Sequence, residues 1–207
     1  MTKNPVTSTV WGGFAPPRAT LLVAAICLGL YLLAGPAWEP LLLTREGLGS
    51  GEFWRLMTGH LIHCDPGHLA WNLGALILLG SVYEEIERPS LSRFVAELGA
   101  CGLAVGLAVV AFAPHLDAYC GLSGALNGLY VLALGAMWRA TRSPLVLLSG
   151  IGDLGKIAVE SAIDHALFTS TAWPPVPVAH MAGFAAGAFI LAAGFLSSWP
   201  RFSVPRP

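Results

Sequence analysis

Residues 19–35 read ATLLVAAICLGLYLLAG, an apolar stretch that contains no charged side chain. A helix needs about 20 mostly apolar residues to cross the hydrocarbon core of a bilayer. The stretch therefore indicates a transmembrane helix, and the rest of the chain has the same character. Hydrophobic residues make up 55% of the 207 residues and charged residues 11%, whereas a soluble domain usually carries roughly 25% charged residues. The composition predicts a protein that crosses a membrane several times.

The same composition argues against three other classes of protein. Too few charges are present to cover the surface of a soluble enzyme or to keep a chain disordered. The formal net charge of -1 gives no basic surface for DNA or RNA, so no nucleic-acid partner is expected.

Six segments are apolar and long enough to be spans. Lipid cannot satisfy the backbone of an open sheet, so we expect each segment to be a helix in an all-α, six-helix membrane bundle. The connection at 36–66 is long, and its Trp38 and Trp54 favour the headgroup level, so we expect it to lie in the outer interface. The predicted spans are 19–35, 67–83, 94–114, 122–138, 144–168 and 178–199.

The basic residues predict the orientation of these spans. Eight of the eleven Lys and Arg alternate onto one side, which the positive-inside rule makes the cytoplasm. Cytoplasmic segments at 1–18 and 200–207 then flank a membrane domain at 19–199. A cleaved signal peptide is the alternative for the first span, but a run of about 17 residues exceeds a usual signal-peptide core, so we expect a retained helix. The eight basic residues are Lys3, Arg18, Arg88, Arg93, Arg139, Arg142, Arg201 and Arg206.

Polar side chains inside spans are costly and are a functional hypothesis by default. His68 and Asn72 lie in the first turns of the second span, Ser123 opens the fourth, and His180 opens the sixth. These three spans run in the same direction, so their polar groups are predicted to lie at one depth near the outer surface. Each residue alone also fits a hydrogen bond between helices, but their coincidence favours a site.

The serine lies in Gly121-Leu122-Ser123-Gly124. The flanking glycines permit a tight turn and a close approach by a substrate backbone. The Ser123 N–H is among the unpaired donors at a helix start. A nucleophile with an attached oxyanion donor is what acyl transfer requires.

The histidine shares one helical face with Gly183 and Gly187. These glycines would let the sixth span approach the fourth closely, which would bring His180 within reach of Ser123 as a general base. We find no Asp or Glu at matching depth, so a Ser–His dyad is predicted rather than a triad. His68 and Asn72 can both donate hydrogen bonds, which suits them to a developing oxyanion.

In this order and topology the motifs resemble the rhomboid intramembrane serine proteases over essentially the whole chain. The resemblance implies that Ser123 is the nucleophile and His180 the base, and that His68, Asn72 and the Gly121 turn support the oxyanion. It also implies peptide-bond hydrolysis near the outer membrane boundary, with the fifth span on the side where a substrate helix arrives. The residues that carry the resemblance are Trp54-Arg55, His63, His68, Asn72, Glu84-Glu85, Gly121 to Gly124, His180, Gly183 and Gly187.

One position departs from the family pattern. Many rhomboids carry an aromatic residue four positions after the serine, stacked on the base, whereas this chain has Asn127, which we expect to orient His180 by a hydrogen bond. The short chain, the GLSG-x-L-x-G pattern and the Lys156–Glu160 spacing are most similar to the rhombosortase subgroup. That similarity implies bacterial substrates with a C-terminal Gly-Gly sorting tail, and a site that faces the periplasm from the inner membrane.

The remaining expectations concern partners and ligands. Single-span membrane proteins and membrane lipid are the expected partners, and the oligomeric state stays open. No cofactor is expected. A metal is not expected either, because His60, His63, His68 and His180 form neither an H-E-x-x-H motif nor a closed Cys/His ligand set.

Two features allow more than one interpretation. The charges of the fifth span are read as a paired, cytoplasm-biased half of a helix, or else as a loose gate, a polar groove or a proton relay. Cys64 and Cys120 both fall on the outer side and would form a disulfide in an oxidising compartment if their geometry allows it. Cys27 and Cys101 fall inside spans and are expected to pack as small apolar groups. The charges concerned are Asp153, Lys156, Glu160, Asp164 and, when protonated, His165.

Two other functions stand beside the protease. A catalytically silent rhomboid-fold protein would bind transmembrane helices without cutting them, and it would commonly lack either Ser123 or His180. A transporter is suggested only by the polar fifth span, and it would depend on Lys156 and Glu160 rather than on Ser123.

Overall fold

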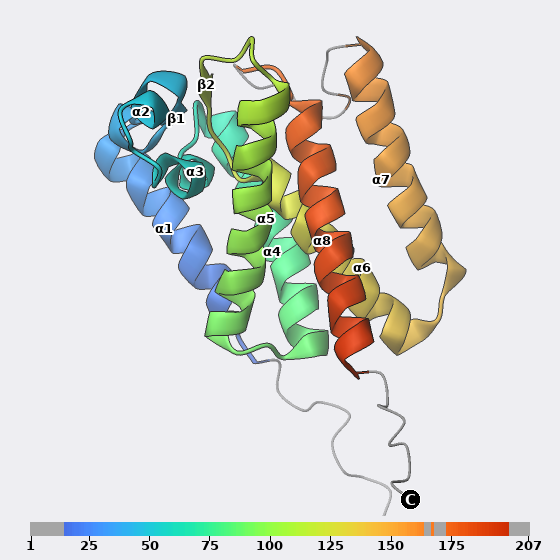
Figure 1. The fold of residues 1–207 in the computed structure, drawn as a ribbon. Coiled ribbons are helices and arrows are strands. Elements are labelled where there is room, and N and C mark those ends of the chain that lie inside the picture. The colour runs from blue at the N-terminus through green and yellow to red at the C-terminus, as the bar shows by residue number, and fades with distance from the viewer. Residues whose placement is uncertain (1–14, 164–166, 168–172, 199–207) are drawn as a thin grey trace, which may run out of the picture.

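The computed structural model describes residues 15–163, 167 and 173–198, except for the side chains of 195–198. Each predicted span contains one long helix, and these helices run up and down beside one another (Figure 1). Lys3, Asp164, His165, Arg201 and Arg206 lie outside the described residues, as do most of the two predicted cytoplasmic segments. The long helices are α1 (Arg18–Ala34), α4 (Pro66–Glu87), α5 (Leu91–Phe112), α6 (Ser123–Thr141), α7 (Pro144–Ile163) and α8 (Pro177–Ser198).

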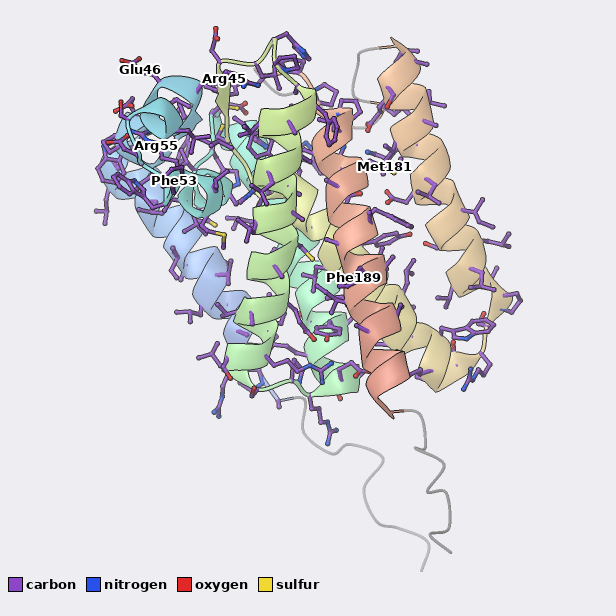
Figure 2. All side chains as sticks on the ribbon, in the orientation of Figure 1. Arg45, Glu46, Phe53, Arg55, Met181 and Phe189 are labelled. Atoms are coloured by element: carbon purple, nitrogen blue, oxygen red, sulfur yellow. The ribbon has the colours of Figure 1, made fainter. Side chains whose placement is uncertain are left out.

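The outer surface of the helices is apolar. Among the described residues, α5 and Pro177–Gly194 of α8 are long and apolar enough to cross a membrane, and α1 is apolar but shorter. Leu33 of α1 is 91% exposed and Phe189 of α8, labelled in Figure 2, is 75% exposed. Such side chains are unfavourable in water and suit contact with lipid. That all six helices cross a membrane stays a prediction.

The first and second predicted spans are joined at their ends by a carboxylate. Glu84 accepts hydrogen bonds from the backbone N–H groups of Ala19 and Thr20 at 3.2 and 2.8 Å. These N–H groups open α1, where no intrahelical acceptor is available and where the helix dipole favours negative charge. The helix α4 therefore continues past its predicted end at residue 83, because its acidic last turn caps α1.

The connection at 36–66, predicted as an interfacial loop, is a folded cap built around a buried arginine. Arg55 is 4% exposed; it donates to the carbonyl of Leu42 at 2.8 Å and to that of Glu39, and it pairs with Glu52 at 2.6 Å. A charge this deeply buried is stable only when it is paired and hydrogen-bonded. The cap consists of η1 (Glu39–Leu41), β1 (Leu43–Thr44), α2 (Arg45–Gly49), α3 (Arg55–Thr58) and η2 (Gly59–Leu61).

The expectation of a purely helical protein is wrong in one detail. Strand β1 pairs antiparallel with β2 (Ala118–Tyr119), in the register Leu43 to Tyr119 and Thr44 to Ala118. Two-residue strands are too short to show an alternating pattern in a sequence. This ladder connects the cap to the segment that leads into α6. A further hydrogen bond, from the Gly121 N–H to the Gly59 carbonyl at 3.0 Å, strengthens the connection.

Helices α6 and α8 touch backbone to backbone, as the glycine spacing predicts. A β-carbon on Gly183 would collide with the carbonyl oxygen of Gly124, and one on Gly187 would collide with that of Gly128. Small residues permit this approach in membrane helices, where packing rather than hydrophobicity drives association. The contact fixes how the first turns of α6 and α8 face each other.

This packing predicts that Gly183→Ala destabilises the protein. The added methyl group has no room, so the helices must separate, and we expect a loss of about 1–3 kcal/mol, measured as thermal unfolding in detergent. Gly74→Ala in α4 is the matched control, because a β-carbon there meets nothing within 4 Å, and it should leave stability unchanged or raise it by about 0.5–1 kcal/mol. Equal unfolding temperatures for the two variants would contradict the close contact.

Candidate active site

Ser123 and His180 meet at the N-terminal ends of α6 and α8. Ser123 is the first residue of α6, and His180 lies in the first turn of α8. His180 Nε2 lies 3.2 Å from Ser123 Oγ, which is within hydrogen-bonding distance. Two residues 57 positions apart are thus brought together by the glycine contact between their helices.

A carboxylate faces the other side of the imidazole. Glu160 Oε2 in α7 lies 3.7 Å from His180 Nδ1, and this nitrogen has no hydrogen-bond partner among the described residues. Glu160 is 1% exposed. Its Oε2 accepts from Lys156 Nζ at 2.7 Å, and its Oε1 accepts from the Leu167 N–H at 3.0 Å.

The sequence-based statement that no carboxylate lies beside the pair is therefore wrong. Helix α7 runs opposite to α6 and α8, so its last turn lies next to their first turns. Glu160 belongs to that last turn, at the same end of the bundle as Ser123 and His180. The predicted Lys156–Glu160 pair is present, whereas Asp153 forms no ion pair within 4 Å in the described part of the chain.

Two side-chain donors gather beside the turn before Ser123. Gly121 has a φ of +108°, a conformation that favours glycine. A side chain at this position would collide with the His68 ring at Nε2 and would lie 3.5 Å from Asn72 Nδ2. Asn72 is 4% exposed, and its Nδ2 has no acceptor within the described residues.

These groups line one cavity. Its volume is about 310 Å³, and its walls come from α4, α6, α7 and α8. Ser123 lies in the wall of this cavity and is therefore accessible to a bound ligand. Its polar lining includes His68, Asn72, Ser123, Asn127, Glu160 and His180.

Comparison with known proteins places the chain in a family. Residues 50–197 match the rhomboid domain. The chain belongs to the rhomboid family. It is 30% identical over 152 residues to a protein named rhomboid protease GluP from Bacillus subtilis (strain 168). The alignment covers 70% of this chain and 27% of that protein, so the chain spans about a quarter of its relative's length.

Membership of the rhomboid family makes the chain an integral membrane protein and gives its motifs a structural context. The Trp54-Arg55 pair lies in the cap and not in the cavity. Arg55 anchors the cap from inside, while Trp54 is half-exposed and donates from Nε1 to the Pro40 carbonyl at 3.4 Å. The pair therefore supports the fold around the site and takes no direct part in it.

The expectation that Asn127 orients His180 by a hydrogen bond is wrong. In this rhomboid Asn127 occupies the position that an aromatic residue holds in many members of the family. Asn127 Nδ2 donates to the Ser123 carbonyl at 2.9 Å, one turn back along α6. The described residues contain no hydrogen bond from Asn127 to His180. The amide instead satisfies a carbonyl of its own helix, and the group that faces His180 Nδ1 is Glu160.

The first turn of α4 is fixed by its N-cap. Asp65 Oδ1 accepts from the His68 N–H at 2.8 Å, and Pro66 occupies the first helical position, where its missing N–H carries no penalty. His68 Nδ1 lies 3.1 Å from Cys64 Sγ. This contact holds the ring so that Nε2 points toward Gly121.

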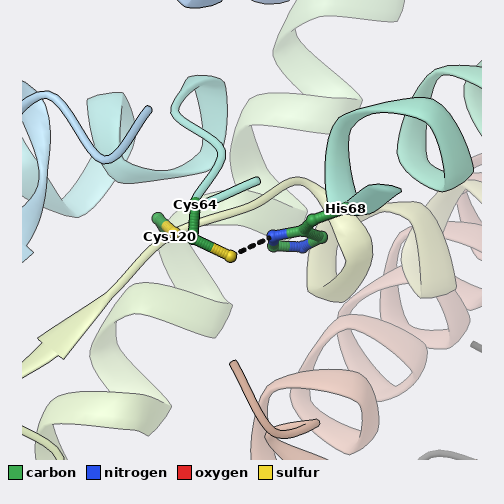
Figure 3. A group of neighbouring side chains, drawn as sticks. All are labelled: Cys64, His68 and Cys120. Carbon is green, nitrogen blue, oxygen red and sulfur yellow. Dashed lines mark hydrogen bonds between the residues drawn. The ribbon is translucent and has the colours of Figure 1, made fainter. Parts of the chain in front are cut away.

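Cys64 and Cys120 are neighbours, and both are free thiols in the structure (Figure 3). A hydrogen bond from Cys120 lowers the pKa of the Cys64 thiol to about 6, and the same bond raises the pKa of Cys120. The sequence placed each cysteine near the site but did not join either of them to His68. Cys27 and Cys101 are fully buried in α1 and α5, in agreement with their predicted packing role.

The other histidines of the cap are buried rather than catalytic. His60 is 3% exposed, and its Nδ1 lies 3.4 Å from the Gly121 carbonyl. His63 is 1% exposed, and its ring packs edge-on against His68 with centroids 5.1 Å apart. Burial lowers the pKa of His63 to about 3, so its imidazole is neutral at physiological pH.

Because His63 is buried as a neutral imidazole, we expect the fold to lose stability in acid. A group with a pKa of about 3 when folded and about 6.5 when unfolded stabilises the fold fully above pH 6.5, and this stability is lost as the pH falls toward 3. Between pH 7 and 5 this residue should lower the free energy of unfolding of wild type by up to about 1.4 kcal/mol per pH unit. The unfolding temperature of His63→Gln should therefore decrease less over this pH range than that of wild type.

His115→Gln is the control, because His115 is exposed in the loop after α5. It should leave the pH dependence of unfolding as it is in wild type. Unfolding curves of His63→Gln that fall with pH as steeply as those of wild type would contradict the role of the buried ring.

Proposed function

We propose that the protein is an intramembrane serine endopeptidase in which Ser123 attacks a peptide carbonyl. The observation that carries this proposal is the 3.2 Å separation between Ser123 Oγ and His180 Nε2 inside the cavity. A serine hydroxyl is a weak nucleophile until an adjacent base takes its proton, and a neutral imidazole can do so. His180 then returns the proton to the leaving amine.

The attack creates a negatively charged oxygen that needs donors. His68 Nε2 and Asn72 Nδ2 both lie beside Gly121, and the Ser123 N–H opens α6 close by. Asn72 supports this role because its amide is buried and unpaired within the described chain, which leaves it available to a bound substrate. Removal of one such donor typically costs about 10²–10³ in turnover.

Glu160 is proposed to orient the base, so that Ser123, His180 and Glu160 act together as a catalytic triad. In a serine–histidine–carboxylate site the carboxylate holds the proton on Nδ1, which leaves the Nε2 lone pair directed at the serine. The distance of 3.7 Å is longer than a hydrogen bond. Such contacts are often loose before a substrate binds and shorten in the reacting complex.

The proposed substrates are single-span membrane proteins that are cut near the outer membrane boundary. The family match and the protease name of the Bacillus subtilis relative support a membrane-embedded substrate. The rhombosortase-like pattern supports a C-terminal Gly-Gly sorting tail as the substrate class. Cytoplasmic termini and a site that faces the periplasm complete the proposal, supported by the alternation of basic residues.

Labelling with a fluorophosphonate probe tests the nucleophile. Wild type should be labelled and Ser123→Ala should not, while His180→Ala should be labelled at least about 10²-fold more slowly because the proton acceptor is lost. Ser92→Ala, at an exposed serine near the start of α5, is the control and should be labelled like wild type. Equal labelling of wild type and Ser123→Ala would remove the nucleophile assignment, and an absence of labelling from both would favour a silent member of the family.

Glu160→Gln tests the third residue. We expect kcat to fall by about 10²–10⁴-fold, with KM little changed, because the amide no longer holds the reactive tautomer. Glu160→Asp should recover part of the loss. The readout is cleavage of a single-span substrate, together with thermal unfolding to show that the variants are folded.

Glu97→Gln is the matched control for this substitution. Glu97 in α5 is mostly buried and accepts hydrogen bonds from Tyr83 and Arg93, far from the cavity. Its variant should lose stability and keep its kcat. A folded Glu160→Gln protein with wild-type kcat would show that His180 works without the carboxylate.

A further inference from the structure

We propose that Cys64, His68 and Cys120 bind a soft metal cation, with Zn²⁺ as the natural candidate. The two sulfur atoms and one ring nitrogen of this group all lie within 4.8 Å of one another (Figure 3). Cys64 Sγ and His68 Nδ1 are 3.1 Å apart. Two thiolates and an imidazole select zinc or copper(I) over magnesium or calcium, which prefer oxygen ligands.

The present geometry is close to that of a tetrahedral zinc site. Zn–S bonds of about 2.3 Å and Zn–N bonds of about 2.0–2.1 Å place neighbouring donor atoms roughly 3.5–3.8 Å apart. The donors therefore need to move by less than about 1 Å to take up this arrangement. Asp65 Oδ2 lies 3.3 Å from Cys64 Sγ but is not one of the three mutually close donor atoms, so the fourth position of a tetrahedral site would be left to a water molecule.

Two separate parts of the chain hold these donors in place. The N-cap hydrogen bond that the His68 N–H donates to Asp65 Oδ1 fixes the turn that carries Cys64 and His68. Cys120 directly follows strand β2, and the next residue, Gly121, donates to the Gly59 carbonyl at 3.0 Å. A cation bound here would join the start of α4 to the segment that leads into Ser123, and it would stabilise the fold by binding the native state.

Binding through Nδ1 has a consequence for the neighbouring site. It leaves the proton of His68 on Nε2, the atom that faces Gly121. A metal ligand whose other nitrogen is a fixed donor is a usual arrangement in proteins. The cation would thus hold His68 in the tautomer that donates to an oxyanion. This consequence rests on the proposed function, whereas the binding itself does not.

Titration of the purified, reduced full chain with Co²⁺ and then Zn²⁺ tests the proposal. We expect saturable one-to-one binding, with a thiolate-to-cobalt charge-transfer band and the visible bands of a tetrahedral site, both removed by Zn²⁺. Cys64→Ser and Cys120→Ser should each weaken binding by more than about 100-fold. Zn²⁺ should raise the unfolding temperature of wild type and not that of these variants.

Matched controls separate this site from the other cysteines and from catalysis. Cys27→Ala removes a buried thiol in α1 and should bind Co²⁺ like wild type. Ser123→Ala should also bind like wild type, so a failure of the proposed protease leaves this test intact. Thermal unfolding without metal shows whether each variant is folded.

Two results would overturn the proposal. One is Co²⁺ binding by wild type that is no tighter than by folded Cys64→Ser. The other is a disulfide between Cys64 and Cys120 in protein isolated from membranes without reductant, seen by mass analysis after alkylation, because bridged sulfurs cannot supply the thiolate ligands.

Discussion

The contact between the backbones of α6 and α8 is the constraint on which the site depends. Gly183 and Gly187 lie directly on the backbone of α6, and no side chain separates the two helices there. A larger interaxial distance would move the His180 ring away from Ser123 by a similar amount, and the 3.2 Å contact would be lost. In lipid such a contact is held by van der Waals packing and not by the hydrophobic effect, so shape complementarity decides it.

The direction of the helices explains why costly polar groups can be buried together. Helices α4, α6 and α8 begin at the level where α7 ends, and each contributes its polar residues at that end. The imidazole of His180, the amide of Asn72 and the Glu160–Lys156 pair therefore face one shared cavity, where they can be solvated or paired. The cap completes this end of the bundle, because its β1–β2 ladder positions the chain just before Ser123.

The length of the apolar segments predicted the long helices, and helical spacing together with helix direction predicted the glycine contact and the meeting of Ser123 with His180. They failed where a feature depends on three-dimensional placement. Several interpretations of the charges of α7 were open, and none of them placed Glu160 beside the first turns of α6 and α8. The burial of Arg55 was not predicted, because it depends on carbonyl groups that only the folded cap brings together. Cys64 and Cys120 come from separate segments, so their common neighbour, His68, was visible only in the fold.

The position of Glu160 links the orientation of the base to the placement of α7. This helix stands at the edge of the bundle (Figure 1), and a β-carbon on Gly152 or Gly155 would meet nothing within 4 Å. The carboxylate lies opposite His180 Nδ1, while Ser123 is held by α6. The Glu160–His180 contact therefore depends on the placement of α7, whereas the Ser123–His180 contact depends on α6 and α8. In the proposed mechanism the polar residues of α7, which are costly in lipid, supply the carboxylate that orients the base.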